Sequence, residues 1–223
     1  MIARSRMLAL AGIGAVISLA GCGSLLETTL PAPQSYVLRL PPGAVATSAA
    51  PAGSILVLRP DPGPGLDSNR IMLLRSEKRF DSYAASLWAA PAPELVGSIL
   101  VDALRRSGGF SNVFDDHAPY PPRYDLRVRL RRFEADYTVD GGSGAPTVFV
   151  TLDATLGQHR ERALITHFSV EGSAKAADDR MSAVVAAFET AMAAAAGDLA
   201  QAAAAAVAGE PRADQASGQA LRR

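Results

Sequence analysis

Cys22 is the residue with the clearest chemistry in this sequence. It is the only cysteine among 223 residues, so it cannot take part in an intramolecular disulfide. It closes the run Leu19-Ala20-Gly21-Cys22, which has the pattern of a lipobox. In such a motif the small residues fit the groove of a signal peptidase, and the thiol is the nucleophile that takes up a diacylglycerol group. The sequence therefore predicts lipidation at Cys22.

The residues before the lipobox have the order of a signal peptide. Arg4 and Arg6 form a short basic region, and the almost wholly apolar run Met7–Ala20 follows. That run is too short to span a bilayer, which needs about 20 residues. We expect residues 1–21 to be a signal peptide, and the alternative is an uncleaved inner-membrane anchor. Acyl chains would then tether the mature chain to the membrane, and Gly23, where aspartate would favour inner-membrane retention, favours the periplasmic face of the outer membrane.

Residues that could bind a metal or catalyse a reaction are few. His117 lies beside Asp115 and Asp116, which indicates either a metal cluster or a polar loop. We favour the loop, because three adjacent residues rarely converge on one ion. His159 and His167 are distant in sequence, and no Gly-x-Ser-x-Gly elbow occurs. The sequence predicts no enzyme activity, no metal and no cofactor.

A row of arginines is the most distinctive surface feature. Apolar residues alternate with three arginines, Arg127, Arg129 and Arg131. In a strand, alternate residues share one face about 7 Å apart. One interpretation is cross-strand pairing with Asp153 or Glu171, and the other is contact with an anionic headgroup or an acidic patch on a partner. Trp88 likewise predicts either a core residue near an edge or an interface anchor.

Composition limits the function classes. The chain carries 22 basic and 22 acidic residues, and without Arg4 and Arg6 the balance becomes 20 to 22. A near-neutral chain argues against nucleic acid as a partner. The remaining length suits one domain. We expect a lipidated N-terminus and tether over 22–34, a domain over 35–208 and a disordered tail over 209–223. Extended, the tether would reach about 45 Å.

The first half of the domain predicts short strands followed by a helix. Four apolar or alternating runs indicate the strands, at Ser35–Leu40, Ile55–Arg59, Ile71–Leu74 and Arg79–Ala84. Pro91 and Pro93 then favour a helix start, and Gly108-Gly109 favours its end. Between them an apolar stripe predicts the buried side of the helix, Val96, Ile99, Leu100, Ala103 and Leu104.

The second half predicts an antiparallel meander and a second helix. After a short strand near Val113, three long alternating runs follow, and the apolar parity of the first changes after Arg132, which indicates a β-bulge. Asp178 or Asp179 would cap the last helix. Its predicted buried stripe comprises Met181, Val184, Val185, Phe188, Met192, Ala195 and Leu199. The expected fold is a single α/β domain with a mixed, largely antiparallel sheet and two packed helices.

Several blocks, in this order, resemble a known family. They are Ser54-Ile55-Leu56-Val57, Leu66-Asp67-Ser68-Asn69-Arg70-Ile71, Leu87-Trp88-Ala89-Ala90-Pro91, Ser107-Gly108-Gly109-Phe110 and Arg132-Phe133-Glu134-Ala135. With the lipobox and the final Ala-rich helix, the set is similar to the ABC-type transport auxiliary lipoproteins, also called PqiC-like lipoproteins. The resemblance covers roughly residues 35–205 and implies a fold similar to the N-terminal domain of TolB.

The resemblance also implies a process and a partner. Such lipoproteins accompany an ABC ATPase, a permease and a periplasmic MCE-domain protein, and these systems move phospholipids or other hydrophobic molecules between membranes. The hypothesis is therefore an outer-membrane lipoprotein that docks the MCE protein, with a homo-oligomer left open. Two alternatives remain: a structural lipoprotein of another envelope complex without lipid cargo, and a lipid-anchored hydrolase.

Overall fold

The computed structural model describes residues 32–43, 45, 51–115, 119–139 and 144–209. A compact unit begins at Pro33, and the account below concerns this unit. Several sequence predictions fall outside the described residues: the signal peptide, Cys22, most of the tether, Asp116, His117 and the tail beyond Gly209.

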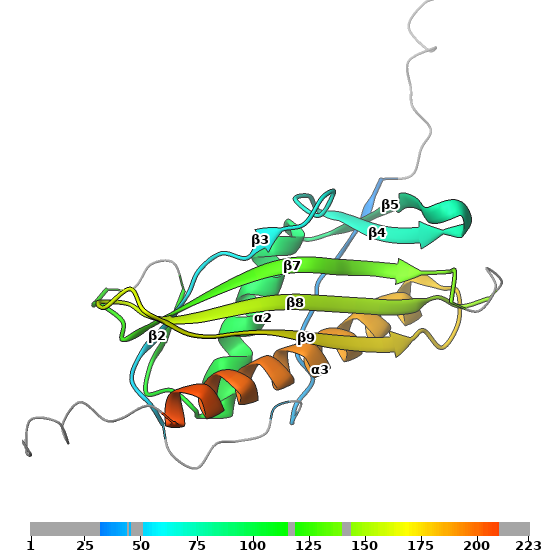
Figure 1. Ribbon diagram of the computed structural model, residues 1–223. Coiled ribbons are helices and arrows are strands. Elements are labelled where there is room, and N and C mark those ends of the chain that lie inside the picture. Colours follow the sequence, from blue (N-terminus) through cyan, green and yellow to red (C-terminus); the bar gives the residue numbers. More distant parts are fainter. Residues whose placement is uncertain (1–31, 44, 46–50, 116–118, 140–143, 210–223) are drawn as a thin grey trace, which may run out of the picture. The chain divides into compact units, whose positions relative to one another are not determined.

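One mixed sheet contains all nine strands of the described residues (Figure 1). They are β1 (Gln34–Tyr36), β2 (Ile55–Val57), β3 (Asp61–Pro62), β4 (Arg70–Arg75), β5 (Arg79–Trp88), β6 (Val113–Phe114), β7 (Tyr124–Asp136), β8 (Thr147–Gln158) and β9 (Leu164–Lys175). The long strand β7 is central: β8 pairs with one side of it, and β2, β3 and β4 follow one another along the other side.

The predicted antiparallel meander is confirmed as β7–β8–β9. The register of β7 against β8 shifts between Leu130 and Arg132, which confirms the predicted bulge. Three strand pairs are antiparallel and include the longest ladders, whereas five short pairs are parallel. The predicted largely antiparallel sheet is therefore correct by length of ladder but not by number of strand pairs. The parallel pairs with β7 arise because a helix crosses between the early strands and β7.

Two predicted strands end more than two residues away from their ends in the structure. The strand expected over Ser35–Leu40 is paired at Gln34–Tyr36, where β1 runs parallel to β5. Leu38 and Leu40 are nevertheless buried, so their alternation reports burial and not strand pairing. β5 continues to Trp88, beyond the predicted end at Ala84.

Two long helices pack on the same face of the sheet (Figure 1). α2 (Ala92–Ser107) carries its predicted stripe fully inside the core. It ends at Gly108, whose positive φ of 65° is the left-handed conformation that glycine adopts at helix ends. A single 3₁₀ turn, η1 (Ser76–Lys78), joins β4 to β5.

The second helix, α3 (Met181–Ala208), lies against β8 and β9. The predicted aspartate cap is wrong: Arg180 is the N-cap and makes no capping bond with its side chain. Asp178 instead binds the backbone N–H and guanidinium of Arg180, and Asp179 accepts a hydrogen bond from Tyr137. Both carboxylates are therefore engaged before the helix begins.

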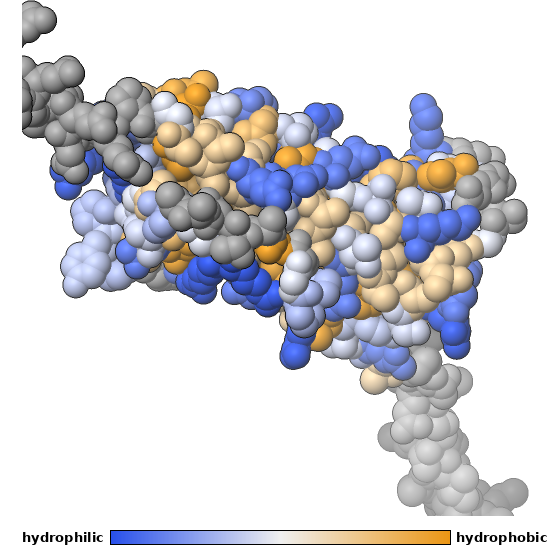
Figure 2. Space-filling view, turned by 90° about the horizontal axis from the view of Figure 1, so that it is seen from below, coloured by the Kyte–Doolittle hydropathy of each residue, from blue (hydrophilic) through white to orange (hydrophobic). Residues whose placement is uncertain are grey.

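α3 is long and apolar enough to cross a membrane by length and composition alone. In this fold, however, it is a core helix, because most of its apolar window is buried against the sheet and α2. Its outward side includes Thr190, Asp198 and Gln201. Seen from below, the molecular surface mixes polar and apolar residues and shows no continuous apolar band (Figure 2).

Candidate functional site

The face of β7, β8 and β9 that points away from the helices is the main polar surface of the described residues; we call it the open face. Side chains reach it in cross-strand rows set by the register. Arg127 lies opposite Thr155, which lies opposite His167. In the next row, Asp153 lies between Arg129 and Ser169. The alternate residues of β7, from Tyr124 to Leu130, are buried in the core.

The structure brings the three predicted arginines together on the open face, all exposed. Arg131 forms the cross-strand pair that the sequence suggested, with its guanidinium 3.5 Å from the Asp153 carboxylate. Glu171, the other suggested partner, is contacted by the Thr151 hydroxyl. Arg127 and Arg129 form no ion pair with any described residue. The face therefore keeps two arginines available to bind an anion.

Arg132, next to the bulge, holds a buried acidic pair that the sequence analysis missed. Its Nε donates to Glu134 at 2.7 Å, and its guanidinium lies 3.3 Å from the Asp136 carboxylate. Its Cζ lies 4.2 Å from the centre of the Phe149 ring, a cation–π contact. Both carboxylates are 6% exposed. The parity change at the bulge was the available signal, because it turns both acids onto the open face.

Charge is unequal along the open face. The end at which β8 turns into β9 carries Arg127, His159 and Arg162 around a hollow of about 600 Å³. The opposite end carries the buried pair Glu134 and Asp136. A surface that is basic at one end attracts and orients anionic ligands or partners.

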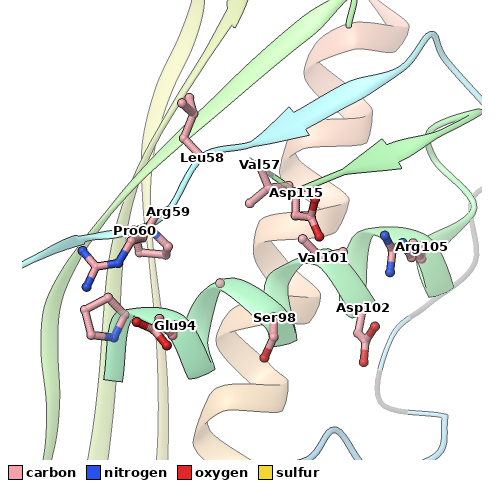
Figure 3. A pocket seen from close by; sticks show the side chains of 12 residues that line it. Val57, Leu58, Arg59, Pro60, Glu94, Ser98, Val101, Asp102, Arg105 and Asp115 are labelled. Carbon is pink, nitrogen blue, oxygen red and sulfur yellow. The ribbon is translucent and has the colours of Figure 1, made fainter. Parts of the chain in front are cut away.

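A second hollow, of about 340 Å³, lies between α2 and the segment that follows β2 (Figure 3). Its walls combine apolar and charged side chains, and α2 contributes Glu94, Ser98 and Asp102. Its arginines are already engaged. Arg59 pairs with Asp67 at 2.9 Å, and Arg105 donates to the Val113 carbonyl at 3.2 Å. This hollow therefore has fewer unpaired arginines than the open face.

The two described histidines, His159 and His167, have different hydrogen-bond partners. His159 binds Asp125, and His167 shares a hydrogen bond with Thr155 on the exposed side of its strand, as predicted. No group of three or more metal-ligating side chains occurs among the described residues. Asp115 is described, but the neighbouring Asp116 and His117 of the suggested cluster are not.

Trp88 belongs to the core, so its interpretation as an interface anchor is corrected. Its side chain is 1% exposed. The ring centres of Trp88 and Phe188 lie 5.1 Å apart, and Phe133 completes an aromatic cluster at 5.7 Å from Trp88. The reason is the parallel pairing of Trp88 with Tyr36, which places the end of β5 inside the sheet rather than at its edge.

Known proteins share this fold. Protein XCC0632 from Xanthomonas campestris, of the family DUF330, superposes with a TM-score of 0.68 at 23% identity, covering 83% of this chain and 99% of that one. An uncharacterised protein superposes with a TM-score of 0.58 at 17% identity, covering 77% and 99%. No curated protein matches the chain.

The sequence itself matches a family model over residues 36–200, from the end of β1 into the last turns of α3. That range includes the open face, the aromatic core cluster, α2 and most of α3. It also matches the extent of the resemblance seen in the sequence. The chain belongs to the family of ABC-type transport auxiliary lipoprotein components.

Proposed function

We propose that this protein is the outer-membrane lipoprotein of an MCE-type ABC transport system. It docks the periplasmic MCE protein and aids the movement of phospholipid, or another hydrophobic cargo, between the membranes. The single observation that carries this proposal is the family match over nearly the whole folded unit. The lipobox at Cys22 adds the membrane anchor, and Gly23 adds the preference for the outer membrane.

The open face is the surface we assign to the partner. It is polar and uncovered by either helix, and it presents Arg129 without an ion pair among the described residues. Arg131 shares its charge with one carboxylate at 3.5 Å, which leaves donors for another anion. The complementary partner surface is acidic, because matched charges guide encounter and fix orientation. The work of the protein is binding, in keeping with an auxiliary component.

A pull-down tests the proposal. The tagged lipoprotein is recovered from envelopes in mild detergent after brief cross-linking, and co-purified proteins are identified by mass spectrometry. We expect an MCE-domain protein together with its permease. Recovery of unrelated envelope proteins alone would instead support a structural lipoprotein of another complex. The similarity to the N-terminal domain of TolB, also part of this proposal, is checked by superposing the two folds.

A further inference from the structure

The β8–β9 turn lies at one end of the three long strands (Figure 1). The hollow beside this turn is built differently from the rest of the open face. Gly157 contributes no side chain to the space, and a Cβ there would lie 3.0 Å from the Ala163 carbonyl oxygen. The turn is held to the sheet by the His159 N–H, which donates to the Arg123 carbonyl at 2.9 Å. A fixed turn with a missing side chain leaves a defined concave site.

Two arginines line this hollow from different parts of the chain. Arg127 extends from β7, and Arg162 comes from the turn, where its φ of 51° is left-handed. Neither forms an ion pair with a described residue. Two guanidinium groups at one concave site offer the planar donor pairs that match phosphate oxygens.

The single acid in the hollow is already occupied. Both Asp125 oxygens accept from His159 Nδ1, at 2.8 and 2.9 Å. A carboxylate has no proton to donate, so Nδ1 carries the hydrogen. Asp125 is therefore oriented toward His159 but keeps its negative charge. Two arginines against this one acid leave the hollow with a net positive charge.

We propose that this hollow binds a phosphate group, with Arg127 and Arg162 as the principal ligands. The source is a phospholipid headgroup or free phosphate, which share this chemistry. Leu164, which lines the same hollow and is 66% exposed, offers an apolar contact to the glycerol ester part of a lipid. The site is distinct from the docking function proposed above and does not depend on it.

Calorimetric titration of the mature chain, residues 23–223 produced without lipidation, tests the site. The ligands are inorganic phosphate, dihexanoyl phosphatidylglycerol below its micelle concentration, and dihexanoylglycerol, which lacks the phosphate. The test variant is R127Q/R162Q. The matched control is R39Q/R79Q, which removes two exposed arginines outside the hollow. We expect the test variant to lose binding by about tenfold or more and the control to retain it.

The outcomes separate the sources. Equal affinity for phosphate and the phospholipid identifies phosphate itself as the ligand, and tighter binding of the phospholipid identifies the headgroup. Absence of binding, equal binding of dihexanoylglycerol, or an equal loss in both variants would overturn the proposal. Should the test variant fold poorly, NMR shifts of the Gly157 and His159 amides in the wild type decide: shifts confined to the hollow support the site, and shifts elsewhere overturn it.

Discussion

Gly172 on β9 allows α3 to approach the sheet closely. A Cβ added there would overlap the Ala191 carbonyl oxygen and would lie 2.9 Å from the Ala195 amide nitrogen. Both neighbours are backbone atoms of α3, which no rotamer change can move. The backbone of α3 can therefore pack directly against β9 because Gly172 has no side chain.

We predict that Gly172→Ala lowers the free energy of unfolding by about 3 kcal/mol, because the helix must shift away from β9. Urea unfolding followed by circular dichroism measures it. The control is Ser173→Ala, one residue along and exposed on the opposite face, for which we expect a change within about 0.5 kcal/mol. Equal effects of the two substitutions would show that the close contact is not limiting.

Cys22 carries the second prediction at this scale. We expect the mature protein to begin at Cys22 and to carry acyl chains, because the lipobox follows a signal-like segment. Mass spectrometry of the N-terminal peptide measures this directly. Cys22→Ala removes the acceptor thiol and should leave the chain without acyl chains, whereas Ser24→Ala, two residues away, should leave lipidation intact. An unmodified Cys22 in the wild type would contradict the prediction.

At the scale of elements, three side chains link β5, the residue after β7 and the segment before α3: Tyr83, Tyr137 and Asp179. The Tyr137 hydroxyl donates to Asp179, so the 2.9 Å bond between the hydroxyls of Tyr83 and Tyr137 is donated by Tyr83. The Arg75 guanidinium lies 5.5 Å from the centre of the Tyr137 ring. Burial, then the bond to Tyr137, raises the pKa of Tyr83 far above its ordinary value of 10, and burial and Asp179 raise the pKa of Tyr137.

A raised pKa means that the folded state holds protons that the unfolded state releases. The resulting stability is present below pH 10 and is lost as pH rises through the folded-state pKa values. We predict that the free energy of unfolding falls above pH 10 and that Tyr83→Phe makes this fall shallower. Urea unfolding between pH 8 and pH 11 measures it. Tyr120→Phe, at a residue 74% exposed, is the control, and an equal change there would contradict the cluster's role.

Some elements could be predicted from sequence patterns and others could not. Periodicity located α2, the meander and the bulge, because each depends on which local face is apolar. The parallel pairs of β1 with β5 and of β2 with β7 depend on contacts between distant segments, which alternation does not encode. The Asp178 cap failed because Arg180 competes for that carboxylate. The arginine row was predictable, but the hollow at Gly157 required the turn to be folded against Arg123.

At the scale of the whole molecule, the fold separates two surfaces. One face of the sheet is covered by two helices, and the other is a polar face with exposed arginines along β7 and two arginines at the hollow beside the β8–β9 turn. Figure 1 shows the three long strands that form this face, β7, β8 and β9, side by side along the sheet. A rigid strand surface holds charged side chains at fixed spacing, which suits recognition of a partner better than a loop would.

The last prediction follows from that surface. Reversing charge with R129E/R131E places two acids beside Asp153, so an acidic partner should be repelled, and we expect recovery of the MCE protein after cross-linking to fall about tenfold or more. The control K78E/R79E makes the same charge change at the exposed η1–β5 junction and should leave recovery unchanged. Because R131E also breaks the ion pair with Asp153, thermal unfolding of both variants is measured, and recovery is compared at a temperature at which both remain folded. Equal losses would mean that overall charge matters and that the open face is not the docking surface.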